Sequence, residues 1–339
     1  MPIPPPSATE EPGASVRPSA TEQPEASLPY SVLATPERRF RRSGPLARRE
    51  ALTGLLWVQA WFIGFLVFTL GPIVAAVYLG FTDWRGRGVP RFVGLQNFIE
   101  IFTDDPLFWQ SLKVTLLFAV IYLPLSLIIG FAMAMVMNQR LVGVKVFRTL
   151  YFLPSVLSGT AVAILWQFVF NRDFGVLNWF VGLFGIDPVS WLVSPRWVIP
   201  SIAIMQLWAV GSTIIIYLGG LQGIPTELYE VAKLDGAGWW ATLRNVTLPM
   251  MSPVIFFQLV LGLIATFQIF TQPYVMTQGG PDNASYFYAL YIYNTAFVQL
   301  RLGYASALSV ILFVIVVGIT AIIFRTSKAW VYYAGGTDS

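Results

Sequence analysis

Residues 225–249 read Pro-Thr-Glu-Leu-Tyr-Glu-Val-Ala-Lys-Leu-Asp-Gly-Ala-Gly-Trp-Trp-Ala-Thr-Leu-Arg-Asn-Val-Thr-Leu-Pro, a polar segment between two long apolar runs. The opening proline followed by Thr226 predicts the start of a helix, with Thr226 as the N-cap and Glu227 in the first turn. Two glycines in three residues, beginning at Gly236, predict its end, because glycine is costly inside a helix and permits unusual backbone angles.

A second short helix is expected after this glycine elbow, from Trp239 to Val246, and Pro249 is expected to stop it. The segment would then form two short helices joined at an angle and held at a membrane surface. Because this is the shape of a docking element, we expect the segment to contact a partner.

The composition places most of the chain's surface in lipid. Apolar residues make up 56% of the chain and charged residues only 11%, whereas a soluble domain has about 25% charged residues. The chain has no cysteine and no histidine, so it lacks a thiolate nucleophile, the commonest metal ligand and the usual proton shuttle at neutral pH. No catalytic residue and no metal site are therefore expected, and the small net charge of +4 makes nucleic-acid binding unlikely to be the function.

Six apolar runs are long enough to cross a bilayer, which takes about 20 helical residues. A further apolar stretch, residues 174–186, is too short to span and is expected to be an interfacial helix. The predicted fold is therefore an all-α integral membrane protein with six transmembrane helices. The predicted spans are residues 52–80, 112–137, 150–171, 197–219, 251–273 and 303–325.

Several predicted spans contain proline, which removes a backbone hydrogen bond and bends a helix. Such bends either shape a cavity between packed helices or are ordinary kinks of membrane helices, and the sequence leaves both open. The prolines concerned are Pro72, Pro124, Pro154 and, near the end of the fifth span, Pro273.

The chain is expected to have three parts, namely a cytoplasmic tail of residues 1–50, a membrane domain of residues 51–328 and a cytoplasmic C-terminal tail of residues 329–339. The first tail is rich in Pro, Ser and Glu, which predicts disorder, and it lacks the pattern of a signal peptide. It ends in the arginine cluster Arg38-Arg-Phe-Arg-Arg42. This cluster is expected to contact anionic lipid, with a specific binding motif as the alternative.

The distribution of Lys and Arg predicts the orientation, because cytoplasmic loops are enriched in both. With a cytoplasmic N-terminus, 14 of the 21 basic residues fall in inside segments. The 138–149 loop supports this orientation independently, since it has three basic residues and no acidic one. Both termini and residues 225–249 are therefore expected on the cytoplasmic side.

Residues 225–249 also carry a recognisable motif. Glu230-Val-Ala232 is followed by three residues and Gly236, then by nine residues and Val246-Thr-Leu-Pro249. This resembles the cytoplasmic loop of the membrane subunits of bacterial ABC importers, in which Glu-Ala-Ala, three residues, Gly, nine residues, Ile, one residue and Leu-Pro follow one another. The departures, Val231 for Ala and Val246 for Ile, are conservative.

Two further features resemble the carbohydrate-importing branch of that family. One is the Asp235-Gly-Ala form of the motif, and the other is a block after the fifth span. The block resembles the larger membrane subunit of maltose-type and glycerol-3-phosphate-type importers, and the resemblance covers residues 50–328. The block consists of Thr277-Gln-Gly-Gly-Pro281, Tyr291-Ile-Tyr-Asn-Thr-Ala-Phe297 and Gly303-Tyr-Ala-Ser-Ala307.

The resemblance implies a type I permease subunit in a bacterial cytoplasmic membrane. Its expected partners are a second homologous permease, two cytoplasmic ATPase subunits and an extracytoplasmic sugar-binding protein. The two short helices would be coupling helices that carry ATPase motion into the spans as alternating access. The sequence has no P-loop pattern, so we expect ATP and Mg²⁺ to be bound by the ATPase partner and this chain not to be an enzyme.

The resemblance also assigns residues of the loop to ATPase docking. Glu227 and Glu230 share a helix face, where they either complement the helix dipole or pair with a cation of the ATPase. Asp235 would cap the second helix or face the partner, and the aromatic pair at Trp239 would sit in the ATPase cleft or rest on the spans. The expected docking residues are Glu227, Glu230, Ala232, Asp235, Gly236, Leu248 and Pro249.

The substrate path is expected on the fourth and fifth spans, where the family places its sugar site. Sugar sites combine hydroxyl-binding polar groups with flat aromatic faces, although for each residue packing between helices is the alternative. The candidates are Gln206, Trp208, Ser212, Thr266, Phe267, Gln268 and Phe270, with Trp166 and Gln167 as weaker ones.

Other functions fit the sequence less well. The same architecture importing a polyol or glycerol 3-phosphate is the nearest alternative. An ion-coupled secondary transporter would need carboxylates inside the membrane, and the predicted spans have none. A membrane enzyme would need a catalytic constellation, which this chain lacks, and the loop motif belongs to importers rather than exporters.

Overall fold

The computed structural model describes residues 45–139 and 143–332. The predictions for the arginine cluster at 38–42 and for the end of the C-terminal tail lie outside these residues. The chain divides into two compact units, Met1–Phe62 and Ile63–Ser339. In the first unit, the described residues belong to helix α1 (Pro45–Phe65), whose side chains from Thr53 onward are exposed, as suits a helix in lipid.

The described residues are almost entirely helical, which confirms the predicted fold class. The one sheet among them is a two-stranded antiparallel ribbon of β1 (Thr82–Asp83) and β2 (Arg91–Phe92), in which Thr82 pairs with Phe92. Asn97, in α3 (Gln96–Thr103), donates to the carbonyls of Gly80 and Thr82, so it fixes the ribbon to the end of the preceding span.

Four helical stretches are long and apolar enough to cross a membrane, although the one that forms the fifth predicted span is interrupted after Phe267. They confirm the first, second, fifth and sixth predicted spans, with ends shifted by several residues. The stretches are Thr53–Gly80, Pro106–Met137, Trp239–Met276 and Leu302–Ser327. The second is helix α4 (Pro106–Met137), which continues through Pro124, and the last is α15 (Leu302–Ser327).

The third predicted span, residues 150–171, is not one straight helix. It consists of α5 (Val144–Val156) and α6 (Gly159–Val169), which meet at 103°. Leu157 between them has extended backbone angles, φ −72° and ψ 148°, so the helical hydrogen bonds end there and restart at Gly159. The prediction of a continuous span was wrong here, although Pro154 before the break and Ser158 and Gly159 after it are residues that weaken a helix.

The fourth predicted span is also bent, by 50°, between α8 (Val198–Trp208) and α9 (Gly211–Gln222). A Cβ at Gly211 would lie 2.2 Å from the carbonyl oxygen of Tyr151, so glycine allows α9 to begin in contact with α5. The described residues therefore provide up to six candidate spans when each bent pair is counted as one.

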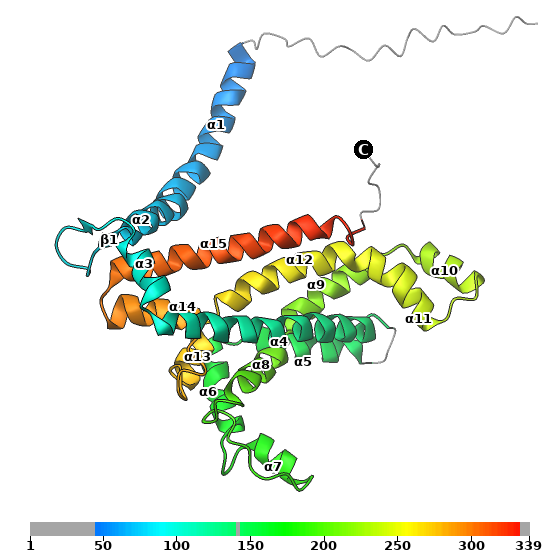
Figure 1. The fold of residues 1–339 in the computed structure, drawn as a ribbon. Helices are drawn as coiled ribbons and strands as arrows, with labels where there is room; N and C mark the ends of the chain where they lie inside the picture. Colours follow the sequence, from blue (N-terminus) through cyan, green and yellow to red (C-terminus); the bar gives the residue numbers. More distant parts are fainter. Residues whose placement is uncertain (1–44, 140–142, 333–339) are drawn as a thin grey trace, which may run out of the picture. The chain divides into compact units, whose positions relative to one another are not determined.

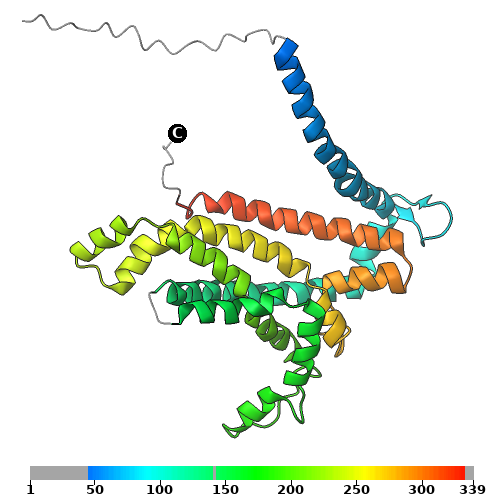
Figure 2. The same cartoon turned by 180° about the vertical axis from the view of Figure 1, so that it is seen from behind.

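The second unit is built around four helices, which we call the bundle: α4, α9, α12 (Leu248–Phe267) and α15. Figures 1 and 2 show α4, α12 and α15 side by side, with α10 (Thr226–Leu234) and α11 (Trp239–Thr242) at one end. At the other end lie α13 (Thr271–Met276) and α14 (Tyr288–Tyr293). We call these the α10 end and the α14 end.

Two clusters of buried side chains hold the bundle together. The cluster near the α14 end contains Phe118, Phe287 and Leu308, all fully buried. The cluster toward the α10 end joins α4, α9 and α12 through Tyr217, Leu218 and Met251. Outside the bundle, α2 (Gly71–Gly80) packs along α15.

The apolar stretch 174–186 does not form a span. It contains a short helix, α7 (Val176–Gly182), which turns into a loop. The amide of Asn178 fixes this loop, because its oxygen accepts from the backbone of Val189 at 3.0 Å and from the indole of Trp191 at 2.9 Å.

Candidate functional site

The loop of residues 225–249 begins with α10, one residue away from the predicted start. Pro225 occupies the N-cap position, and no side chain caps the helix, so Thr226 is the first helical residue and not the N-cap. Glu227 lies in the first turn as predicted, and Lys233 lies in the last. Both charges complement the helix dipole.

The glycine elbow is a hydrogen-bonded helix end. The N–H of Ala237 donates to the carbonyl of Ala232 at 2.9 Å, and the N–H of Gly236 donates to that of Lys233 at 3.1 Å. Gly236 has a φ of +72°, a conformation that favours glycine at this position of the Schellman motif. A Cβ there would meet no atom within 4 Å, so within this chain Gly236 serves the backbone conformation and not close packing.

The second helix does not stop at Pro249. Helix α11 runs through a π-helical turn, Leu243–Thr247, directly into α12, which begins at Leu248. The N–H of Leu248 bonds to the carbonyl of Leu243 in this wider turn. Proline normally clashes with the carbonyl four residues earlier, and we attribute the uninterrupted helix to the wider turn and to the position of Pro249 in the first turn of α12.

A π-helical turn also precedes Pro72 in the first span, at Leu66–Leu70, which supports this explanation. The consequence for the loop is mechanical. The elbow and the fifth span belong to one continuous helical rod from Trp239 onward, so a displacement of the elbow reaches the span without an intervening flexible segment.

One polar contact ties the first helix of the loop to this rod. The hydroxyls of Tyr229 and Thr247 are 3.3 Å apart, and Thr247 also donates to the carbonyl of Thr242 at 3.4 Å. Between the loop and the end of α4 lies a cavity of about 440 Å³, with Asn138 and Lys233 in its wall. The loop therefore contacts its own chain on one side only.

The loop also exposes large apolar side chains. Leu234 is 87% exposed, and the indoles of Trp239 and Trp240 are 60% and 74% exposed. These two indoles contact each other edge to face, with centroids 4.6 Å apart. Trp239 and the half-buried Leu243 line the cavity beside the end of α4, whereas Trp240 is the more exposed of the two indoles.

The remaining predicted docking residues divide by exposure. Glu227, Glu230 and Asp235 are exposed, and no described residue forms an ion pair with any of them. Asp235 does not cap the second helix, because Gly238 occupies the N-cap of α11 and no side chain caps it. Ala232 is the buried residue of α10. Leu248 and Pro249 lie in the first turn of α12.

The substrate-path candidates on the fourth span lie near the bend between α8 and α9. The amide oxygen of Gln206 accepts from Gln272, in α13, at 3.3 Å. Trp208 is 39% exposed and contacts the ring of Trp166 edge to face at 5.9 Å. Ser212, in the first turn of α9, is exposed.

The candidates on the fifth span are separated by the structure. Thr266 is buried and donates to the carbonyl of Gly262 at 2.6 Å, and Phe267 is buried in the core. Gln268 is exposed at the point where α12 ends, and Phe270 follows it as the N-cap residue of α13. The first two side chains therefore face packed protein, and the last two lie at a break in the span.

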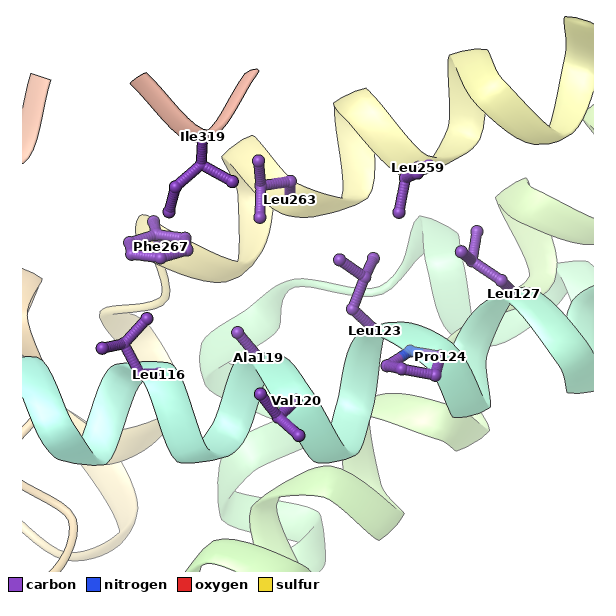
Figure 3. A pocket seen from close by; sticks show the side chains of 10 residues that line it. All are labelled: Leu116, Ala119, Val120, Leu123, Pro124, Leu127, Leu259, Leu263, Phe267 and Ile319. Carbon is purple, nitrogen blue, oxygen red and sulfur yellow. The ribbon is translucent and has the colours of Figure 1, made fainter. Parts of the chain in front are cut away.

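The ring of Phe267 faces an apolar cavity of about 460 Å³ between α4, α12 and α15 (Figure 3). Leu116, Leu123, Leu263 and Ile319 line it together with this ring. Because its wall presents hydrocarbon and almost no polar group, the cavity offers nothing that would orient a hydroxyl-rich solute.

Sequence reasoning missed a polar cluster at the α14 end. Asp105 is the N-cap of α4, and one of its carboxylate oxygens accepts from the backbone of Leu107 and Phe108. The other oxygen accepts from the hydroxyls of Tyr291 and Tyr304, the latter at 2.6 Å. Burial, and then the bond to Asp105, raise the pKa of Tyr291, which therefore remains a donor.

An ion pair supports this cluster. Arg301 bonds to Glu100 at 2.8 Å and lies over the ring of Tyr304, 4.1 Å from its centroid. Asp105, Tyr291 and Tyr304 together form what we call the Asp105 clasp, which joins α4, α14 and α15. Tyr291 and Tyr304 belong to a block that the resemblance marked, but the sequence did not connect that block with Asp105.

Comparison with known proteins places this architecture in a family. Residues 126–327 match the family described as "Binding-protein-dependent transport system inner membrane component". The probable ABC transporter permease protein YesP of Bacillus subtilis is 38% identical over 290 residues, which are 84% of this chain and 94% of the relative.

Two further relatives have names that include a solute. The lactose transport system permease protein LacF of Rhizobium radiobacter is 34% identical, covering 84% of this chain and 96% of the relative. The trehalose/maltose transport system permease protein MalF of Thermococcus litoralis is 31% identical, covering 84% of this chain and 96% of the relative.

The fold itself also has a solved counterpart. A chain from the crystal structure of a bacterial ABC transporter involved in the import of the acidic polysaccharide alginate matches with a TM-score of 0.73 and 24% identity. The match covers 84% of this chain and 99% of that chain. This chain, an integral membrane transport subunit and not an enzyme, belongs to the family of binding-protein-dependent transport system inner membrane components.

Proposed function

We propose that this chain is the permease subunit of an ATP-driven carbohydrate importer and forms half of its translocation path. A second, homologous permease would form the other half, and an extracytoplasmic sugar-binding protein would deliver the solute. ATP and Mg²⁺ would be bound by two ATPase subunits on the cytoplasmic side, where both termini of this chain and the 225–249 loop would lie.

The observation that carries this proposal is the construction of the loop. It presents two exposed carboxylates, Glu227 and Glu230, beside exposed apolar rings, and it continues as one helical rod into α12. A partner that binds the exposed face can move the fifth span by moving the elbow. Exposed tryptophans beside charges are typical of a binding surface.

Carbohydrate is the solute that the relatives favour, since their names include lactose and trehalose/maltose. The chain's own residues support a neutral solute. The exposed path candidates Trp208, Ser212 and Gln268, with the half-buried Gln206, offer amides, a hydroxyl and an aromatic face but no cation. Glycerol 3-phosphate would need a positive partner for its phosphate, so it is the weaker alternative.

The proposal is tested by isolating the complete complex from its native membrane through a tag on this chain. The complex is reconstituted with the binding protein in proteoliposomes. ATP-dependent uptake is then compared for labelled maltose, trehalose, lactose, maltotetraose and glycerol 3-phosphate. We expect a second permease and an ATPase to co-purify and at least one of the sugars to be taken up. Uptake of glycerol 3-phosphate alone, or isolation without an ATPase, would overturn the proposal.

A further inference from the structure

Four aromatic rings form a continuous series between α13 and α14, which we call the aromatic ladder: Phe270, Tyr274, Tyr293 and Phe297. Phe270 stacks on Tyr274 with centroids 5.2 Å apart and an interplanar angle of 18°. Tyr293 contacts both rings, at 4.9 and 5.3 Å, and Phe297 continues the series at 5.2 Å from Tyr293. Each ring therefore touches the next.

The ladder starts at the break in the fifth span. Phe270 lies two residues after Gln268, where α12 ends, and Tyr274 lies one turn further along α13. Tyr293 ends α14, and Phe297 lies in the π-helical segment Asn294–Val298 that follows. Both helices lie at the α14 end of the bundle, away from the docking loop (Figures 1 and 2). The ladder thus leads from the substrate-path candidates toward the expected extracytoplasmic side.

The ladder is open to its surroundings and carries polar groups. Tyr274 is 41% exposed and Phe297 is 64% exposed. The rings of Tyr274 and Tyr293, which contact each other edge to face at 5.3 Å, each carry a phenolic hydroxyl. Flat apolar faces with hydroxyls beside them match a pyranose ring, which has apolar C–H faces and hydroxyls around its edge.

Neighbouring hydrogen bonds hold the ladder in place. Gln167 donates to the carbonyls of Val275 and Met276 at the end of α13, at 3.0 and 3.3 Å. On the other side, the amide of Asn294 donates to the hydroxyl of Tyr286 at 3.0 Å. A platform held in this way loses little conformational entropy when a ligand stacks on it.

A second group of exposed aromatic residues provides a contrast. Trp179, Phe180 and Phe184, on and after α7, are 66%, 51% and 70% exposed. None of the path candidates contacts these rings, and the described ring contact among them joins only Phe180 and Phe184. They have the character of membrane-interface anchors, which need apolar area but no continuous series.

We propose that the aromatic ladder is a carbohydrate-binding platform at the outer mouth of the path. Its aromatic rings stack on the pyranose rings of the carbohydrate as the carbohydrate leaves the binding protein. The carbohydrate then moves on to Gln268 and the neighbouring breaks in the helices. This inference rests on the proposed function, because it needs a carbohydrate solute. Longer oligosaccharides contact more rings, so they depend on the ladder more strongly than disaccharides do.

The test compares four forms of the complete complex: native, Tyr274→Leu/Tyr293→Leu, Tyr274→Phe/Tyr293→Phe, and Trp179→Leu/Phe180→Leu. Leucine keeps apolar bulk but removes the ring, and phenylalanine keeps the ring. Saturation-transfer NMR with maltose, trehalose, lactose and maltotetraose, each presented singly and without binding protein, reports sugar protons close to aromatic side chains. ATP-dependent uptake of each sugar is measured in parallel.

We expect the Tyr274→Leu/Tyr293→Leu complex to lose most of the transfer signal and to take up the imported sugar roughly tenfold more slowly. The Tyr274→Phe/Tyr293→Phe complex should keep most of the transfer signal and most of the uptake rate. The Trp179→Leu/Phe180→Leu complex should match the native complex in both measurements.

An unchanged signal and unchanged uptake in the Tyr274→Leu/Tyr293→Leu form would overturn the inference while leaving the proposed function intact. Equal losses of signal and uptake in the Trp179→Leu/Phe180→Leu form would also overturn the inference, because the rings of the ladder would then act only as membrane anchors. Failure of the native complex to take up any sugar would instead reject the proposed function, and the platform with it.

Discussion

The two ends of the bundle are built in opposite ways. At the α14 end, the Asp105 clasp joins three helices, and Phe287 and Tyr288 beneath it are fully buried. At the α10 end, Tyr229 and Thr247 supply the one side-chain hydrogen bond between the two loop helices among the described residues, and Trp239 and Trp240 are exposed. One end is held together by contacts within the chain, whereas the other leaves charged and aromatic side chains exposed.

The largest effect on stability is expected at the completed end. Asp105→Ala removes the N-cap of α4 and leaves the hydroxyls of Tyr291 and Tyr304 without their acceptor. The loss of a cap costs about 1 kcal/mol, and each of the two partly buried donors left unpaired costs a further 1–3 kcal/mol, so we expect a loss of about 3–7 kcal/mol. Thermal unfolding of the purified complex in detergent measures it.

Asp104→Ala is the matched control, because Asp104 is the neighbouring residue, is exposed and bonds only to Thr103 among the described residues. Its unfolding midpoint should stay close to native. If the two variants unfolded alike, the clasp would not stabilise the α14 end, and the contrast between the two ends would fail.

The loop of residues 225–249 was largely predictable from the sequence because its signals are local. The spacing from Glu230 to Pro249 marked the loop, and Gly236 marked the elbow, which the structure forms with a left-handed residue at that position. Pro249 was misjudged as a helix stop, since a proline in a sequence does not reveal the π-helical turn that accommodates it.

The α14 end was less predictable because its partners are distant in the chain. Asp105 and Tyr304 are separated by 199 residues, and no pattern in a single sequence connects them. The same holds for Tyr274 and Tyr293 of the aromatic ladder, whose contact depends on how α13 and α14 fold back. The bend after Val156 was missed for a different reason, since Pro154, Ser158 and Gly159 mark a weak point in the helix but do not reveal how large the bend is.

An intermediate effect is expected at the elbow. Gly236 has a left-handed backbone, whereas Gly238 has φ −71° and ψ 174°, which any residue adopts. Gly236→Ala should therefore cost about 1 kcal/mol and displace the elbow, lowering transport, while Gly238→Ala should leave transport near native. Uptake by proteoliposomes of equal complex content measures the difference. Equal effects of the two substitutions would show that crowding against the ATPase, and not backbone conformation, makes glycine necessary at Gly236.

The smallest effect on stability is expected at the exposed rings of the loop. Trp240 is 74% exposed, so Trp240→Ala should change the unfolding of the permease pair without its ATPase by no more than about 0.5 kcal/mol. Retention of the ATPase subunit during size-exclusion chromatography should nevertheless fall. A variant that destabilised the permease pair but retained the ATPase would mean that Trp240 packs on this chain's own spans.

Substrate-stimulated ATPase activity tests the central claim most directly, namely that the loop transmits ATPase motion to the fifth span. The reconstituted complex with native sequence is compared with Glu230→Ala and with Asp173→Ala, an exposed acid that follows α6 outside the loop. We expect Glu230→Ala to lose the stimulation by solute-loaded binding protein at least tenfold and Asp173→Ala to retain it. Stimulation that survives Glu230→Ala unchanged would contradict the account and reduce the loop to a connector.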